Sequence, residues 1–313
     1  MFLIYINDIP KAFENAKPTL FADDTNIFIF HKTKETLFRN ANKELQSLEN
    51  WLLANQLSLS IGKDKETKFS FFSPKQNDTK SNLPSLKLLG HNVPQTEYVK
   101  YLGVLLDDCL NFKKHISKLR DKLKQYIGVF YLLRNNLPKQ CLRTLYFTFI
   151  FNNIYYCSEI YGNTCASYLD PLQKAQNEAL RALQFKNRFY PINEMHKDFQ
   201  ILKVADVVEY KLSKLIHSLI TGSPKLPESL QNLIIPINTT HKRNTIKTHQ
   251  SYNKKENISI GKRQLKCKPS QTWSEYPSNI KDTPAHSQFK TAFYECKIEG
   301  YADITLNFAP NMF

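Results

Sequence analysis

The chain has 313 residues, of which 42% are apolar and 12% aromatic, a composition typical of a folded protein. It contains no run of about 18 uncharged apolar residues, so no membrane span is predicted. The apolar start has no basic residues before it, and no secretory signal is predicted either. The six cysteines have no zinc-type spacing, which predicts free thiols. We expect an intracellular protein, nuclear or cytoplasmic, without membrane contact.

The net charge of +15 is unevenly distributed. Residues 1–110 contain 13 basic and 13 acidic side chains, whereas the remaining 30 basic and 15 acidic ones follow residue 110. Such a concentration of positive charge favours a polyanionic partner, most commonly nucleic acid. A generally basic surface without a specific partner explains the charge about equally well.

The first thirty residues are rich in β-forming side chains. Residues 3–6 are a short apolar run, which we expect to be extended. Residues 19–22 and 25–30 are two more β-rich runs on either side of Asp23-Asp24. Because Asp tolerates turn backbone angles, these two runs predict a β-hairpin.

A helix follows over residues 33–54, where apolar side chains recur at helical spacing after Thr33, a candidate N-cap. Residues 57–61 alternate like a half-buried strand, and residues 69–72 predict another strand. A further strand region over 98–106 is broken by Gly103. Together these elements predict an α+β chain.

After residue 110 the pattern becomes helical. Residues 113–134 predict an amphipathic helix whose basic side chains lie mostly opposite its apolar face. Pro138 suits the start of a second helix, Asp170-Pro171 of a third, and residues 201–220 predict a fourth.

From residue 222 the character changes again. Residues 239–268 are polar and basic and predict a linker or loosely ordered arm. Four apolar residues beyond it could form a small closing unit: Trp273, Ile280, Phe289 and Phe293. The basic cluster Lys262, Arg263, Lys266 and Lys268 fits phosphate contact, a nuclear-import patch or a solvated loop. We therefore predict three regions, 1–110, 111–222 and 223–313.

The Asp23-Asp24 pair is the strongest chemical signal. Two adjacent carboxylates at the tip of a hairpin can hold Mg²⁺, which prefers carboxylate oxygens and keeps other positions for water and phosphate. Two such ions can activate a 3′-hydroxyl and stabilise a leaving pyrophosphate, which also needs a third carboxylate nearby. Taken alone, Asp23-Asp24 is more often a solvated turn.

The flanking residues resemble a known family. Residues 2–10, followed by Leu20-Phe21-Ala22-Asp23-Asp24-Thr25, are similar to the palm of LINE-type, jockey-like non-LTR retrotransposon reverse transcriptases, whose central motif is Tyr or Phe before Ala-Asp-Asp. Further matches to the family's next helix-strand segment are Trp51, Asn55, Leu57, Leu59, Lys63 and Phe69. Residues 101–104, with Phe112, His115 and Ile116, resemble its primer-grip hairpin and the start of its thumb.

The resemblance implies an RNA-directed DNA polymerase, a nucleotidyltransferase that acts on an RNA template and a DNA primer. It implies that Asp23 and Asp24 are catalytic ligands of Mg²⁺ or Mn²⁺, and that Lys63 lies near the phosphates of the incoming nucleotide. Three residues would support the primer: Tyr101, Leu102 and Gly103. Three basic residues on the amphipathic helix would contact the nucleic-acid backbone: Lys114, Lys118 and Lys122.

The sequence also departs from the family. The family's first catalytic Asp, its Gly- and Gln-containing loop and its fingers have no counterpart, and Ser60 and Asp64 replace the usual Asn and Thr around Lys63. We therefore expect a partial palm followed by a helical thumb-like region, a truncated enzyme that is inactive alone. The alternative is a non-catalytic nucleic-acid-binding remnant or a pseudogene product. His115 is expected at the helix surface or in packing rather than as a base. Tyr155, Tyr156 and Tyr161 could stack on bases, but we expect them in a helical core.

Overall fold

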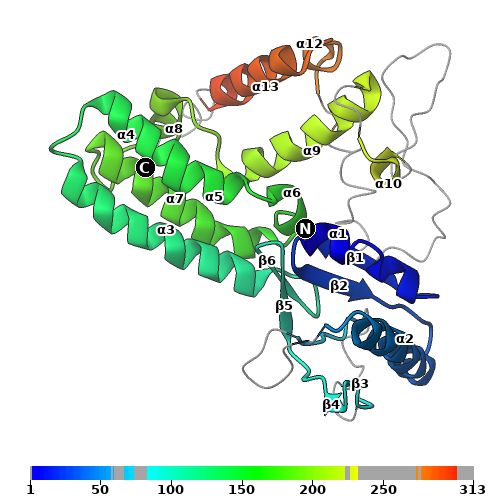
Figure 1. Cartoon of the computed structure of the whole chain (residues 1–313). Coiled ribbons are helices and arrows are strands. Elements are labelled where there is room, and N and C mark those ends of the chain that lie inside the picture. Colours follow the sequence, from blue (N-terminus) through cyan, green and yellow to red (C-terminus); the bar gives the residue numbers. More distant parts are fainter. Residues whose placement is uncertain are drawn as a thin grey trace, which may run out of the picture. The chain divides into compact units, whose positions relative to one another are not determined.

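The computed structural model describes residues 2–57, 59, 67–73, 83–222, 226–231, 273 and 276–301. The chain forms two compact units, Met1–Leu110 and Asn111–Phe313. The first unit combines helices with antiparallel hairpins, and the described part of the second is helical (Figure 1). The chain is therefore α+β, as the sequence predicts. Among the described residues, no helix has the length and apolar character needed to cross a membrane.

The first unit begins with two short helical segments, α1 (Phe2–Tyr5) and the 3-10 turn η1 (Ile9–Ala12). The prediction of extended structure over residues 3–6 is therefore wrong. A four-residue apolar run fits a helix or a strand equally well, and Pro10 suits the first turn of η1. Ile6 and Ile9 are buried in the core of this unit.

Three antiparallel hairpins and one long helix make up the rest of the first unit. The strands are β1 (Lys17–Phe21) with β2 (Asp24–Phe28), β3 (Lys87–Leu88) with β4 (His91–Asn92), and β5 (Tyr98–Tyr101) with β6 (Val104–Asp107). The helix α2 (Lys34–Ala54) begins after Thr33, as predicted. The Thr33 hydroxyl donates to the Thr36 hydroxyl at 3.0 Å and does not cap the helix backbone.

The segment after α2 does not contain the strand predicted over 69–72, and the strand predicted over 57–61 lies largely outside the described residues. Within the predicted strand of 69–72, Phe69 forms a single parallel bridge with Gln95, and no strand is formed. Leu57 and Leu59 are not in a strand, and the rest of 57–61, together with Lys63, lies outside the described residues. Leu57, Phe69 and Phe71 pack in the core of the first unit with the buried face of α2, and Leu59 and Phe72 are exposed.

The second unit is built around two long helices, α3 (Lys113–Leu133) and α7 (Ala166–Gln184), which pack against each other. Between them the chain forms α4 (Lys139–Leu145), a π-helical turn η2 (Tyr146–Phe151), α5 (Asn152–Tyr155) and α6 (Ser158–Tyr161). The predicted starts of α3 and α4 are confirmed. The predicted start of α7 is wrong, because the helix begins at Ala166 and Pro171 lies inside it, beyond the first turn, where it removes one backbone hydrogen bond.

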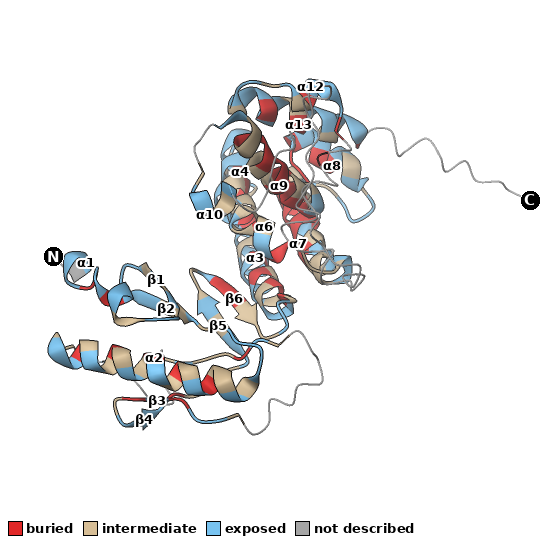
Figure 2. Cartoon of the chain, turned by 90° about the vertical axis from the view of Figure 1, so that its right-hand side faces the viewer, coloured by how far each residue is buried: buried red, intermediate tan, exposed pale blue. Residues whose placement is uncertain are grey.

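The other helices of the described part of the second unit follow in chain order. They are α8 (Ile192–Phe199), α9 (Val204–Thr221), α10 (Glu228–Gln231), α12 (Ser278–Lys281) and α13 (His286–Gly300). Figure 2 shows buried residues concentrated on α7 and α9. The four apolar side chains of the predicted closing unit are at most 1% exposed, and α13 packs against α9.

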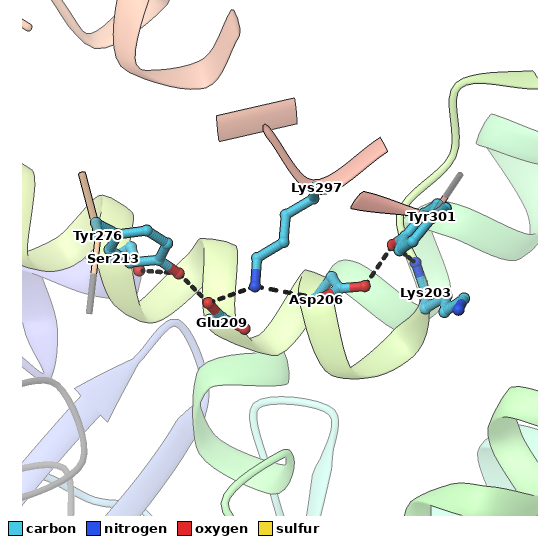
Figure 3. A network of polar contacts seen from close by, with 7 residues as sticks. All are labelled: Lys203, Asp206, Glu209, Ser213, Tyr276, Lys297 and Tyr301. Carbon is cyan, nitrogen blue, oxygen red and sulfur yellow. Dashed lines mark hydrogen bonds and ion pairs between the residues drawn. The ribbon is translucent and has the colours of Figure 1, made fainter. Parts of the chain in front are cut away.

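A polar network fastens this closing unit to α9. Figure 3 shows Lys297 of α13 reaching between two carboxylates of α9, with its Nζ 2.7 Å from Glu209 and 3.5 Å from Asp206. The hydroxyl of Tyr276 donates to Glu209, and that of Tyr301 donates to Asp206. Each carboxylate therefore has both an ammonium and a phenol as partners, which offsets the cost of its partial burial.

Candidate metal site and nucleic-acid surface

The tip of the β1–β2 hairpin carries the two candidate metal ligands. Phe21 pairs with Asp24, so Ala22 and Asp23 form the two-residue turn. Ala22 has a positive φ of 53° and Asp23 does not, a pattern that matches a type II′ turn. Both carboxylates are exposed to solvent. The turn thus presents two adjacent carboxylates that an ion could reach.

Contacts with the core and with α2 fix the position of this hairpin in the first unit. Leu20 and Ile27 pack against the core of the first unit. Glu44 of α2 is only 2% exposed, and its carboxylate accepts hydrogen bonds from the backbone N–H groups of Glu14 and Asn15 at 3.0 and 2.7 Å. These charge-assisted bonds compensate the buried carboxylate and hold the loop that leads into β1. The sequence analysis missed this role of Glu44, whose position on the apolar side of α2 was the available signal.

The donor set fits a hard divalent cation in part. Carboxylate oxygens are the ligands that Mg²⁺ prefers, and it is commonly held by one or two of them together with water and phosphate. Within the described residues, no group of three or more His, Cys, Asp or Glu side chains is placed to hold a metal ion. The described chain therefore contributes two carboxylates to such a site.

The predicted primer-supporting hairpin lies beside the hairpin that carries Asp24. The ring of Tyr101 on β5 meets the ring of Phe28 on β2 edge to face, with centroids 6.0 Å apart. Phe28 belongs to the outer face of the β1–β2 hairpin, where large rings remain 45–70% exposed: Phe21, Phe28 and Phe30. The structure therefore joins Tyr101 to the end of the β1–β2 hairpin that lies away from the Asp23-Asp24 turn, through an aromatic contact that the sequence did not predict.

The turn after Tyr101 requires unusual backbone angles. Leu102 and Gly103 have φ values of 43° and 85°, as in a type I′ turn, and Tyr101 pairs with Val104 across it. Glycine adopts such angles without strain, whereas a leucine there costs about 1 kcal/mol. Val104 is buried and anchors the hairpin.

The three candidate lysines lie on the exposed side of α3. The opposite side is buried in the second unit: Ile116, Leu119, Leu123, Ile127 and Phe130. Lys114, Lys118 and Lys122 are exposed, and Lys122 Nζ donates to Asn153 Oδ1 at 2.8 Å. Arg120 is paired with Asp121 at 2.7 Å, so it adds little net charge. The structure brings the three lysines onto one stripe, as helical spacing requires.

His115 and Tyr161 are packing residues, as predicted, whereas Tyr156 is 52% exposed and its predicted place in the helical core is wrong. Their rings lie 5.1 Å apart, and Tyr161 is fully buried with its hydroxyl donating to the carbonyl of Ile154. Burial lowers the pKa of His115 from its usual value. Cys157 and Cys165 are free thiols, in agreement with the cysteine spacing.

The chain is similar to three RNA-directed DNA polymerases of mobile elements. It is 24% identical over 221 residues to the probable RNA-directed DNA polymerase from transposon X-element of Drosophila melanogaster, a match that covers 68% of this chain. It is 23% identical over 211 residues to the polymerase from mobile element jockey of Drosophila funebris, and 22% identical over 229 residues to the jockey polymerase of Drosophila melanogaster. These matches cover 65% and 70% of this chain.

The match spans only part of these relatives. It covers 24%, 22% and 24% of their lengths, so the chain corresponds to about a quarter of each. No protein-family model and no solved structure matches the chain.

Proposed function

We propose that this chain is the part of a mobile-element RNA-directed DNA polymerase that carries the metal-binding hairpin and a helical nucleic-acid grip. The observation that supports this best is the type II′ turn that presents Asp23 and Asp24 to solvent within the motif Phe21-Ala22-Asp23-Asp24. The similarity to the X-element and jockey polymerases extends over about two thirds of the chain.

Each part of the site has a distinct role in this proposal. Asp23 and Asp24 would hold Mg²⁺ or Mn²⁺, which when bound activates the primer 3′-hydroxyl and stabilises the leaving pyrophosphate. The hairpin that turns at Leu102-Gly103 supports the primer beside them, with Tyr101 held against Phe28. Lys63 contacts the phosphates of the incoming nucleotide. The RNA template and DNA primer are the nucleic-acid partners.

We further propose that this chain does not polymerise by itself. A two-ion site needs more ligands than two carboxylates, and the described residues group no third one with them. A segment outside this chain would supply another carboxylate. Loss of one metal ligand removes several kcal/mol of transition-state stabilisation, on the order of 10³-fold in rate.

Primer extension and metal binding test these two statements separately. On poly(rA)/oligo(dT) with Mg²⁺ or Mn²⁺, we expect no extension by the chain alone. If the chain alone extended the primer and Asp23→Ala did not, the need for another segment would be refuted, while the catalytic role of Asp23 and Asp24 would be supported. Independently, Mn²⁺ should broaden the NMR signal of the Ala22 methyl group in the wild type and not in an Asp23→Asn, Asp24→Asn variant. Equal broadening in the wild type and the variant would contradict a metal site at Asp23 and Asp24.

A second candidate function is nucleic-acid binding without catalysis, favoured by the exposed lysine stripe on α3 and the positive charge that follows residue 110. Binding to an RNA/DNA hybrid should then depend steeply on salt, with about one unit of log-log slope for each neutralised phosphate. Replacing the stripe by glutamine should flatten the slope by about one unit for each phosphate that is no longer neutralised, measured by fluorescence anisotropy. The variant is Lys114→Gln, Lys118→Gln, Lys122→Gln.

The control for this experiment is Lys290→Gln, which removes an exposed positive charge from α13. It should leave the slope nearly unchanged. A triple variant that behaves like the control would exclude the α3 stripe as the grip.

A further inference from the structure

A groove of about 410 Å³ opens where the C-terminal ends of α3, α7 and α8 meet the start of α4. Its volume falls within the range of small-molecule sites. Leu142, Leu183 and Phe199 form an apolar floor, and each is at most 2% exposed. Arg134, Lys139 and other polar side chains stand on its walls. The groove therefore combines an apolar base with charged walls.

The two segments that form most of the walls are strongly basic. Residues 131–143 contain Arg134, Lys139 and Arg143 and no acidic residue. Residues 181–190 contain Arg181, Lys186 and Arg188 and again no acidic residue. Among the groove-lining side chains of the described chain, Asp198 is the one carboxylate. The local charge favours an anionic ligand.

Helix capping accounts for only part of this charge. Helix C-termini attract cations, and Arg134 Nη1 donates to the carbonyl of Ala182 at 3.5 Å near the end of α7. Lys139, in contrast, stands in the first turn of α4, where a positive charge is unfavourable to the helix dipole. Arg188 lies between α7 and α8 and is exposed. Lys139 Nζ lies 5.9 Å from the ring centroid of Phe199, so capping does not explain the position of either charge.

Exposed aromatic rings alternate with the basic residues at the rim. The sequence of 185–190 is Phe-Lys-Asn-Arg-Phe-Tyr, with Phe185 54% and Phe189 90% exposed. The guanidinium of Arg134 lies 4.7 Å from the ring centroid of Tyr131 and 5.0 Å from that of Phe185. Lys186 Nζ lies 3.8 Å from the ring centroid of Tyr190. The loop therefore presents exposed rings next to basic side chains, the combination on which unpaired bases stack in single-strand-binding proteins.

Two polar atoms of the groove residues are also unsatisfied. Arg134 Nε and Gln184 Oε1 are buried and make no hydrogen bond within the described structure. Buried polar atoms normally have partners, so these atoms could pair with a ligand after a small side-chain rotation. One of these atoms is a donor and the other an acceptor, the two kinds of group that the edge of a nucleobase can pair with.

We propose that this groove, with the 185–190 loop at its rim, binds single-stranded nucleic acid. Bases stack on Phe185 and Phe189, one base enters the apolar groove, and Lys139, Lys186 and Arg188 meet the backbone phosphates. Stacking platforms joined to basic grooves are the general means of binding unpaired strands, because every base has a π-face.

The proposed site is distinct from the lysine stripe on α3. Sixteen residues of one helix separate Lys118 from Arg134, about 24 Å at 1.5 Å per residue. The site does not depend on the catalytic pair or on duplex binding. A strand that leaves a duplex held at the stripe could reach the groove within a few nucleotides, so the two sites can serve one nucleic acid.

Fluorescence anisotropy on the full chain tests the site with three labelled probes of about 12 nucleotides: oligo(U) RNA, oligo(dT) and an RNA/DNA hybrid. The variant Phe185→Ala, Phe189→Ala should bind the unpaired probes more weakly, by on the order of 10-fold for each stacking ring removed, and the hybrid within about twofold of wild type. Tyr156→Ala, which removes another ring that is 52% exposed, is the matched control and should change neither. The unpaired probe bound more tightly identifies RNA or DNA as the ligand.

A charge variant provides the second measurement. Lys186→Gln, Arg188→Gln should flatten the salt dependence of oligo(U) binding by about 0.7 units of log-log slope for each phosphate that is no longer neutralised. Equal weakening of unpaired and hybrid probes by the aromatic variant, or no weakening of either, would overturn the proposal. The proposal would also be overturned if the wild type did not bind the unpaired probes. If hybrid binding were then lost only in the α3 lysine variant, the lysine stripe on α3 would remain as the nucleic-acid-binding surface.

Discussion

Replacing His196 should make the stability of the second unit much less sensitive to acid. His196 is fully buried on α8, with Nδ1 3.0 Å from the carbonyl of Ile201 and Nε2 3.0 Å from the side-chain amide of Asn177. Burial lowers the pKa of His196 to about 4, an effect that the hydrogen bond to Ile201 opposes and the charge of Lys203 increases. The folded protein therefore holds this imidazole neutral.

The sign and size of the effect follow from the pKa difference. In the unfolded chain His196 takes up a proton near its ordinary pKa of 6.5, whereas in the folded chain it does so only near 4. Its contribution to stability is complete above pH 6.5 and is lost progressively as the pH falls to about 4. At about 1.4 kcal/mol per pKa unit, the loss is roughly 3 kcal/mol.

The assay is urea unfolding of the full chain at a series of pH values between 7 and 4. Trp273 is 1% exposed in the core of the second unit, so its fluorescence reports on that unit once Trp51 is replaced by phenylalanine. The test variant is His196→Gln, which cannot titrate. The control is Leu202→Ala, which opens a cavity at a fully buried position without removing a titratable group.

We expect the wild type and the Leu202→Ala control to lose stability in parallel as the pH falls. The difference in unfolding free energy between the wild type and His196→Gln should shrink by roughly 3 kcal/mol between pH 7 and pH 4. This change does not depend on how much the substitution destabilises the protein at pH 7. A difference that stays constant with pH would refute the reasoning, because it would mean that His196 titrates alike in both states.

Two further substitutions test backbone and packing constraints. Ala22→Gly should leave the hairpin intact and raise the unfolding free energy of the first unit by up to about 1 kcal/mol, because glycine adopts a φ of 53° without strain; a lower melting temperature would contradict this. Gly162→Ala should lower the stability of the second unit by about 1–3 kcal/mol in urea unfolding, because its Cβ would stand 2.2 Å from Val208 Cγ2 and 2.4 Å from the carbonyl oxygen of Ser158. A loss within about 0.5 kcal/mol would show that α6 and α9 separate easily.

Local sequence patterns predicted the elements that depend on neighbouring residues. The β1–β2 hairpin follows from two β-rich runs on either side of a turn, and α2 and α3 follow from apolar residues at helical spacing. The failures occur where the local signal is short or ambiguous. The apolar run of 3–6 forms a helix, and α7 begins five residues before Pro171, because the burial of its apolar face outweighs the backbone hydrogen bond that the proline removes.

The sequence by itself therefore determined the α+β character, the carboxylate pair, the lysine stripe and the resemblance to retrotransposon polymerases, since all of these depend on residues close together in the chain. Only the tertiary structure decided what stands beside them. It brought Tyr101 against Phe28, placed the Glu44 carboxylate under the loop before β1, and joined residues 134, 142, 185 and 199 in one groove. These contacts form because side chains distant in the sequence are buried against one another. The periodicity of apolar residues predicts which face of a helix is buried, but it does not predict which other element packs on that face.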